Sequence, residues 1–136
     1  MKRLYVICLV CLVFVSCTKE DSETVDLLAP LVGVWEASSI VTTNCGDMSD
    51  DGIFNCDGPC YQLTVRDDFD FSFNNYLEGT SMDGTLRVEA TTLQFCDEDD
   101  INCNPEVEYT LNDDLLTIVA YWQAKDCDVI AVYNKQ

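Results

Sequence analysis

Apolar and polar residues alternate with a period of two along most of the chain beyond residue 31, as in β-strands that bury one face. The alternation is strongest between residues 61 and 74, where Tyr61, Leu63 and Val65 are followed by three phenylalanines at every second position. Similar alternation recurs over residues 34–41, 86–95, 107–111, 115–122 and 127–133. About eight strands with almost no helical period favour an antiparallel barrel or a closed sandwich.

Turn-forming residues separate these alternating runs. The segment Asn112-Asp113-Asp114 predicts a hairpin, and Asp83-Gly84 predicts another turn. The apolar phase slips near Thr91-Thr92, which predicts a bulge or a turn. Residues 43–59 are rich in glycine and aspartate, and we expect turns there rather than regular structure. The apolar run Leu27–Leu31 is interrupted by Pro30, which fits a single helical turn or short plug.

The first sixteen residues have the pattern of a secretory signal. Met1-Lys2-Arg3 is cationic, and the apolar run over residues 4–15 is too short to span a bilayer. Ser16 followed by Cys17 resembles the lipobox of bacterial lipoproteins, which implies that Cys17 carries diacylglycerol as the new N-terminus. The alternative is an ordinary secretory peptide cleaved nearby. We therefore expect a signal peptide over 1–16, a lipidated flexible tether over 17–30 and a barrel domain over 31–136.

The residues that follow Cys17 indicate where in the cell envelope the protein is delivered. In lipoproteins an aspartate at the next position tends to retain the product at the inner membrane, and this chain has Thr18 instead. Lys19-Glu20-Asp21 resembles the signal that exports some Gram-negative lipoproteins to the cell surface. The resemblance implies an outer-membrane protein exposed outside the cell. The alternatives are the periplasmic face of that membrane, and a chance match within an acidic linker.

The charge of the chain is strongly one-sided. It has 25 acidic and 7 basic residues and a net charge of −18, and loss of Lys2 and Arg3 with the signal would leave the remainder more negative. Such a surface repels nucleic acid and anionic lipid headgroups, so nucleic-acid binding is excluded. Membrane contact is expected through the lipid anchor alone.

Six of the nine cysteines remain after Cys8 and Cys11 leave with the signal and Cys17 is lipidated. They are Cys45, Cys56, Cys60, Cys96, Cys103 and Cys127. An even number in a small exported domain predicts disulfides. The competing interpretation is a thiolate metal site with Cys56 and Cys60 as one half, which the absence of histidine makes less favourable.

Barrel topology narrows the fifteen possible pairings. In a closed up-and-down barrel the last strand lies antiparallel to the first, so Cys127 at the start of the last strand approaches Cys45 at the end of the first. We therefore predict the pair Cys45–Cys127. The pairs Cys96–Cys103 and Cys56–Cys60 are then predicted as local loop staples.

The segment Leu31-x-Gly33-x-Trp35, followed by a cysteine-bearing loop and a late Tyr109-x-Leu111 hairpin, resembles the lipocalin-like lipoprotein domains of Gram-negative bacteria. The resemblance implies a single antiparallel barrel of about eight strands. In lipocalins this tryptophan closes the barrel floor, often under a basic side chain of the final strand, where this chain offers only Lys135. From the phase of each strand, the residues predicted to point inward are Trp35, Leu63, Phe71, Val88, Tyr109, Ile118 and Val129.

The sequence argues against an enzyme, a metal site or a cofactor. Without histidine there is no Ser-His or Cys-His couple, and the abundance of aspartate makes any carboxylate pair uninformative. The acidic runs Asp47-x-x-Asp50-Asp51 and Asp97–Asp100 offer oxygen ligands for calcium, but neither has EF-hand spacing, and solvated loops are favoured.

Two functions compete. The first is binding of a small apolar molecule in the barrel mouth, with aromatic wall or rim residues. The candidates are Phe69, Phe73, Tyr76, Tyr121 and Trp122. The second is a solid barrel whose outward faces and acidic loops meet another protein of the cell envelope.

Overall fold

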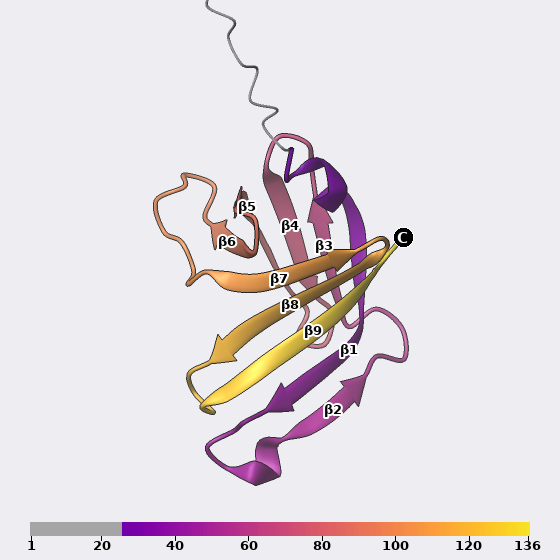
Figure 1. Ribbon diagram of the computed structural model, residues 1–136, viewed down its shortest axis with the longest axis vertical. Coiled ribbons are helices and arrows are strands. Elements are labelled where there is room, and N and C mark those ends of the chain that lie inside the picture. Colours follow the sequence, from indigo (N-terminus) through magenta and orange to yellow (C-terminus); the bar gives the residue numbers. More distant parts are fainter. Residues whose placement is uncertain (1–25) are drawn as a thin grey trace, which may run out of the picture.

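The computed structural model describes residues 26–136, and it shows a closed antiparallel barrel of eight strands with one additional strand (Figure 1). The elements in chain order are η1 (Ala29–Leu31), β1 (Gly33–Thr43), η2 (Met48–Asp50), β2 (Gly52–Asn55), β3 (Tyr61–Val65), β4 (Asp70–Asn75), β5 (Thr80–Val88), β6 (Thr92–Cys96), β7 (Val107–Asn112), β8 (Leu115–Trp122) and β9 (Cys127–Lys135). Each strand from β3 to β8 pairs with the strand that follows it, and β1 pairs with both β3 and β9, which closes the barrel. The expected signal peptide and the lipidation at Cys17 lie outside the described residues.

The all-β fold agrees with the alternating sequence pattern and is consistent with a lipocalin-like fold. Within residues 26–136 no helix is long and apolar enough to cross a membrane. The predicted hairpin at residues 112–114 joins β7 to β8, and the predicted phase slip falls between β5 and β6.

One end of the barrel is closed by the 3-10 turn η1 and by Trp35. The indole Nε1 of Trp35 donates a hydrogen bond of 2.7 Å to the carbonyl oxygen of Leu31, and the ring is fully buried. Lys135, near the end of β9, places its Nζ 5.0 Å from the centre of the Trp35 ring and donates to the carbonyl oxygen of Pro30. The basic side chain over a floor tryptophan is the arrangement that the lipocalin resemblance implied.

Gly33 makes this closure possible. Its φ angle is +142°, and a Cβ atom there would lie 2.9 Å from Cε of Lys135. Leu28, which precedes η1, is buried in the same core as Leu31. The chain therefore packs against the barrel before the first strand begins.

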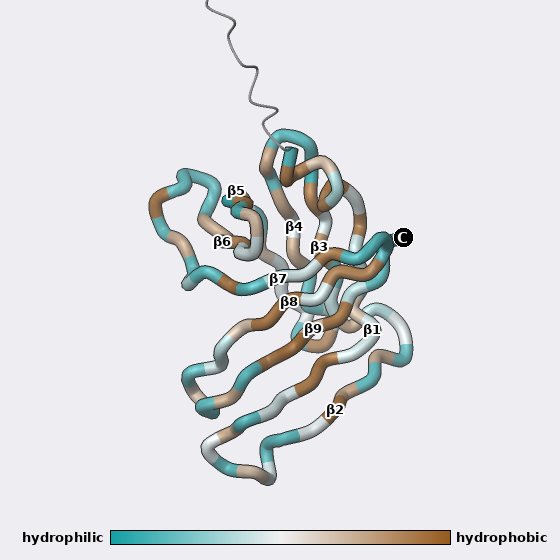
Figure 2. The backbone as a smooth tube through the Cα atoms, in the orientation of Figure 1, coloured by the Kyte–Doolittle hydropathy of each residue, from teal (hydrophilic) through white to brown (hydrophobic). Residues whose placement is uncertain are grey.

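The core fills the half of the barrel nearest this closed end. Four of the residues predicted to point inward, Trp35, Leu63, Phe71 and Ile118, are buried in one cluster with neighbours from the other strands. Two more, Val88 and Tyr109, are half-buried and pack against that cluster. Figure 2 shows hydrophobic stretches recurring along β8, β9 and β1 between hydrophilic loops.

Two local predictions were wrong. The segment over residues 43–59 contains the short strand β2 and the 3-10 turn η2, because β1 extends past β3 and leaves a free edge on which Gly52–Asn55 pairs with Ser39–Thr42. The pair Asp83-Gly84 lies within β5 and forms no turn.

Gly84 is required at its place in β5 by a close backbone approach. A Cβ atom there would lie 2.0 Å from the carbonyl oxygen of Cys96, the last residue of the neighbouring strand β6. Glycine within a strand often marks such an approach rather than a turn.

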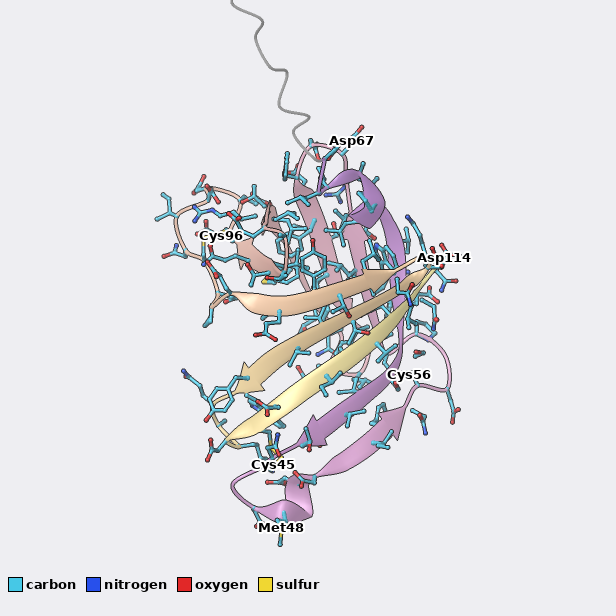
Figure 3. All side chains as sticks on the ribbon, viewed as in Figure 1. Cys45, Met48, Cys56, Asp67, Cys96 and Asp114 are labelled. Carbon is cyan, nitrogen blue, oxygen red and sulfur yellow. A yellow bond between two sulfur atoms is a disulfide. The ribbon has the colours of Figure 1, made fainter. Side chains whose placement is uncertain are left out.

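The three disulfides join Cys45 to Cys127, Cys56 to Cys60 and Cys96 to Cys103, which are the predicted pairs. Cys45 follows β1 and Cys127 opens β9, so their bond fastens the seam between the first and last strands at the end opposite Trp35. Figure 3 shows this separation, with Cys45 and Met48 at one end of the molecule and Asp67 at the other. The disulfides replace the competing metal-site interpretation of these cysteines.

Candidate ligand cavity

The half of the barrel away from Trp35 holds two adjoining apolar cavities that open to solvent. Their volumes are about 180 Å³ and about 220 Å³. Both are lined by Phe73, Ile118, Ala120 and Tyr133, so the two cavities adjoin at these four side chains, and we call the pair the hollow. The first is completed by Leu63, Met82, Phe95, Asn104 and Val107, and the second by Ile40, Tyr61, Val129 and Ala131.

The hollow exists because alanines occupy inward positions near the mouth. On β8 and β9 the paired residues Ile118 and Ala131, then Ala120 and Val129, point to the inner face. One step toward the closed end, Leu116 pairs with Tyr133 and both are buried. Small side chains at the mouth therefore leave space that larger ones fill at the floor.

The neighbouring strands β6 and β7, which form the barrel wall beside the first cavity, share few paired residues. β6 and β7 pair through two positions only, Thr92 with Glu108 and Leu93 with Val107, whereas β8 and β9 pair through eight. Residues 97–106 leave the barrel as a long loop closed by Cys96–Cys103. The first cavity therefore lies against the least hydrogen-bonded part of the barrel wall.

Tyrosines supply most of the polar character of the cavity. Tyr133 is 5% exposed and lines both halves, and burial, with a further contribution from neighbouring Tyr61, raises the pKa of its phenol well above the ordinary value. Burial also raises the pKa of Tyr61, whose ring stacks on Phe73 at 5.7 Å between centroids. The only other polar side chain in the lining is that of Asn104, and no charged side chain belongs to it.

Of the five aromatic residues predicted from the sequence, Phe73 alone lines the cavity. Phe69 is exposed in the turn between β3 and β4 at the closed end. Tyr76 is exposed beyond β4, where its hydroxyl donates to Gln62.

The remaining two candidates lie at the end of β8. Tyr121 is on the outer face, 58% exposed, and its hydroxyl donates to a carboxylate oxygen of Asp126. Trp122 shares the inner face with Ala120 but lies at the rim, half exposed, with Lys125 Nζ 5.7 Å from its ring centre. Sequence reasoning missed Tyr133; the signal that could have found it is the inward phase that it shares with Val129.

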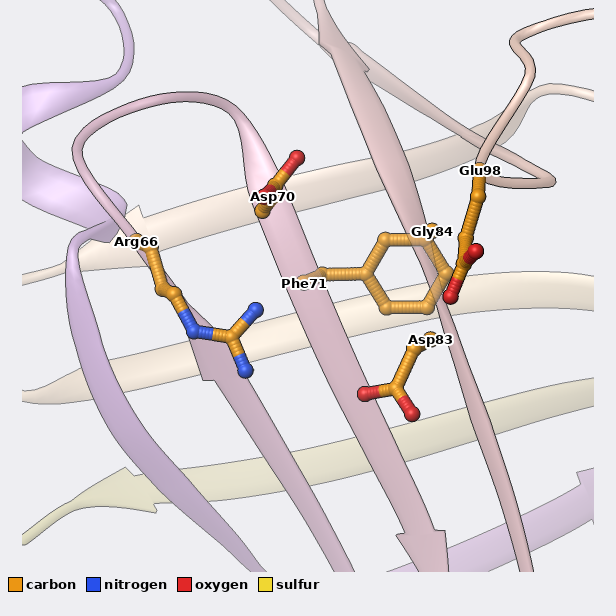
Figure 4. A pocket seen from close by; sticks show the side chains of 6 residues that line it. All are labelled: Arg66, Asp70, Phe71, Asp83, Gly84 and Glu98. Atoms are coloured by element: carbon orange, nitrogen blue, oxygen red, sulfur yellow. The ribbon is translucent and has the colours of Figure 1, made fainter.

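A larger cavity, of about 420 Å³, lies beside β4 and β5 (Figure 4). It is lined by Arg66, Asp70, Phe71, Asp83, Gly84 and Glu98. Arg66 donates to the hydroxyl of Ser72, which donates in turn to Asp83. Arg66 and Asp83 are therefore linked through Ser72 rather than free for a ligand.

The carboxylates of the acidic run Asp47-x-x-Asp50-Asp51 form hydrogen bonds and an ion pair with neighbouring residues of the protein. Asp47 accepts hydrogen bonds from the backbone N–H and hydroxyl of Ser49, which lower its pKa. Asp50 pairs with Lys125 at 2.7 Å. Asp51 accepts from the backbone N–H of Cys45.

The acidic run Asp97–Asp100, which follows β6, also forms hydrogen bonds and an ion pair within the protein. Asp97 accepts from the side chain of Asn102 and the backbone N–H of Ile101, and these bonds lower its pKa. Asp100 pairs with Arg87 at 3.0 Å, and the hydrogen bond from Arg87 lowers the pKa of this carboxyl. These bonds give both runs a structural role in holding their loops.

No known protein-family model matches this chain, and a search of curated proteins found no significant similarity. The cavity, rather than a relative, is therefore the starting point for assigning a function.

Proposed function

We propose that this protein is a non-enzymatic, lipid-anchored protein of the outer membrane, exposed on the cell surface, whose barrel binds a small apolar molecule in the mouth cavity. The observation that supports ligand binding is the pair of adjoining apolar cavities in a barrel closed at one end by Trp35. Small-molecule sites are typically apolar clefts of about 300–1,000 Å³ with a few polar groups, and the two adjoining cavities of about 180 and about 220 Å³ together lie near the lower end of that range.

The anchor and the location rest on the sequence around Cys17. The described chain enters the barrel at the closed end, next to Trp35. A lipid on Cys17 would therefore attach the protein to the membrane from the side of its closed end. Protease added to intact cells should digest the mature chain, and full protection would contradict surface exposure.

The alternative function was a solid barrel that meets another envelope protein. The empty space beside Ala120 and Ala131 does not support a filled barrel, so ligand binding is the better proposal.

Ligand binding can be tested with the uncharged dye N-phenyl-1-naphthylamine, which fluoresces in apolar surroundings. The exported protein with Cys17→Ser has no lipid that could bind the dye itself. We expect saturable enhancement, because the cavity is apolar and open. Ala120→Phe should weaken binding at least about tenfold by filling the hollow, since the affinity depends on the apolar contacts that it removes.

The matched control is Val119→Phe, which adds a ring to the adjacent residue on the opposite face of β8. It should bind the dye like the parent protein. Near-ultraviolet circular dichroism would show that both variants are folded. Absence of saturable binding, or equal binding by both variants, would refute the proposal.

A further inference from the structure

The cavity is lined by a largely buried tyrosine whose hydroxyl has no protein partner. Tyr133 is 5% exposed, yet the hydrogen bonds among residues 26–136 include none to its phenolic oxygen. That oxygen is not sealed from solvent, since no fully buried side-chain atom of this part of the chain lacks a partner. Because Tyr133 lines both cavities, a molecule in the hollow can meet its hydroxyl. A ligand group that forms this hydrogen bond gains affinity.

The walls around Tyr133 carry no positive charge that could pair with an anion. The lining of both cavities contains no arginine or lysine, and its polar groups are two phenols and the amide of Asn104. A carboxylate or sulfonate placed there would lose its hydration without gaining a charged partner. The phenols of Tyr61 and Tyr133 resist ionisation for the same reason, because burial raises the pKa of each.

The loops around the mouth add to this selectivity. They cover residues 44–60, 75–79 and 123–126, and together they contain six acidic residues and one lysine. That lysine, Lys125, is paired with Asp50. Hydrogen bonds from Ser49 lower the pKa of Asp47, which keeps this rim carboxylate ionised. An approaching anion therefore meets a negative field before it reaches the cavity.

We propose that the cavity selects an uncharged apolar molecule with one hydrogen-bonding group, which meets the Tyr133 hydroxyl, and that it rejects anionic amphiphiles. This inference rests on the proposed ligand binding and names the chemical class of the ligand. An alcohol or ketone of suitable size belongs to that class, whereas a fatty-acid carboxylate does not.

Two matched probe pairs test the rejection of anions. N-phenyl-1-naphthylamine and 8-anilinonaphthalene-1-sulfonate share one ring system and differ by a sulfonate, and 1-decanol and decanoate share one chain length. With the Cys17→Ser protein, we expect the sulfonate to bind at least about tenfold more weakly than the uncharged dye. Decanol should displace the dye at a concentration at least about tenfold lower than decanoate. Raising the salt concentration should narrow both gaps, because salt screens the rim charges more than the buried cavity.

The variant Tyr133→Phe tests the proposed hydrogen bond between the ligand and the Tyr133 hydroxyl. The variant keeps the ring and removes a hydroxyl that has no protein partner, so it should fold like the parent. We expect decanol to bind about fivefold more weakly, as for loss of one hydrogen bond. Binding of p-xylene, which has no polar group, should be unchanged. The matched control is Tyr109→Phe, whose hydroxyl donates to the carbonyl oxygen of Glu89 outside the cavity and should leave decanol binding unaltered.

Each outcome separates the two proposals. Equal displacement by decanoate and decanol, or equal loss of decanol and p-xylene binding in Tyr133→Phe, would overturn the assignment of the ligand class while leaving apolar binding intact. If the uncharged dye fails to bind at all, the proposed function is wrong and this inference fails with it.

Discussion

The disulfide Cys45–Cys127 should contribute far more to stability than either local staple. It closes a loop with a sequence separation of 82, compared with 4 for Cys56–Cys60. In the chain-entropy model the loss of loop-closure freedom from the unfolded state gives about 4.5 kcal/mol for the long loop and about 2 kcal/mol for the short one. The value for the long loop is comparable with the whole free energy of unfolding of a marginally stable domain, since domains typically have about 5–15 kcal/mol.

The double variants Cys45→Ala/Cys127→Ala and Cys56→Ala/Cys60→Ala provide a matched comparison, because each removes two sulfur atoms and leaves no thiol. Urea denaturation followed by tryptophan fluorescence would measure both free energies of unfolding. We expect the first variant to lose roughly 2–3 kcal/mol more than the second, or to be largely unfolded. Equal losses, or a larger loss from the short staple, would refute the reasoning from loop length.

Three further results are expected. Gly84→Ala should destabilise the protein by at least about 2 kcal/mol in urea denaturation, because its Cβ would meet the Cys96 carbonyl oxygen at 2.0 Å, whereas Gly52→Ala, with nothing within 4 Å, should cost far less. The pKa of Tyr133 is raised in the folded state, so above the ordinary value of 10.0 the unfolded state ionises first. The contribution of Tyr133 to stability should be constant below that pH and fall as the pH rises beyond it, and Tyr133→Phe should reduce the fall in a urea-denaturation series. In hydrogen exchange by mass spectrometry, the amides of β6 should exchange before those of β8, because β6 and β7 pair through only two positions; equal protection would contradict this.

The alternating pattern predicted the barrel because each strand buries one face. The burial of individual residues in the structure follows the predicted phase. Leu63 and Phe71 are both buried at the predicted phase. The same rule cannot separate the core from the cavity, since Phe71 and Phe73 share a phase yet only the second borders the hollow. That difference depends on the alanines opposite, on strands whose register the sequence does not reveal.

Short-range signals failed where a tertiary contact decides the backbone. Asp83-Gly84 reads as a turn, but the glycine is there to admit the carbonyl oxygen of Cys96. The strand β2 exists only because β1 outruns β3, which no pattern within Gly52–Asn55 could show. Conversely, the pair Cys45–Cys127 was predictable because closure of the barrel brings its first and last strands together.

The two ends of the folded chain meet at the closed end of the barrel. The backbone N–H of Gln136 donates to the carbonyl oxygen of Val34, and Lys135 reaches the carbonyl oxygen of Pro30. A fluorescent reporter or affinity tag fused after Gln136 would thus be held beside the floor, with the whole barrel between it and the mouth. The protein can carry such a cargo without masking the cavity.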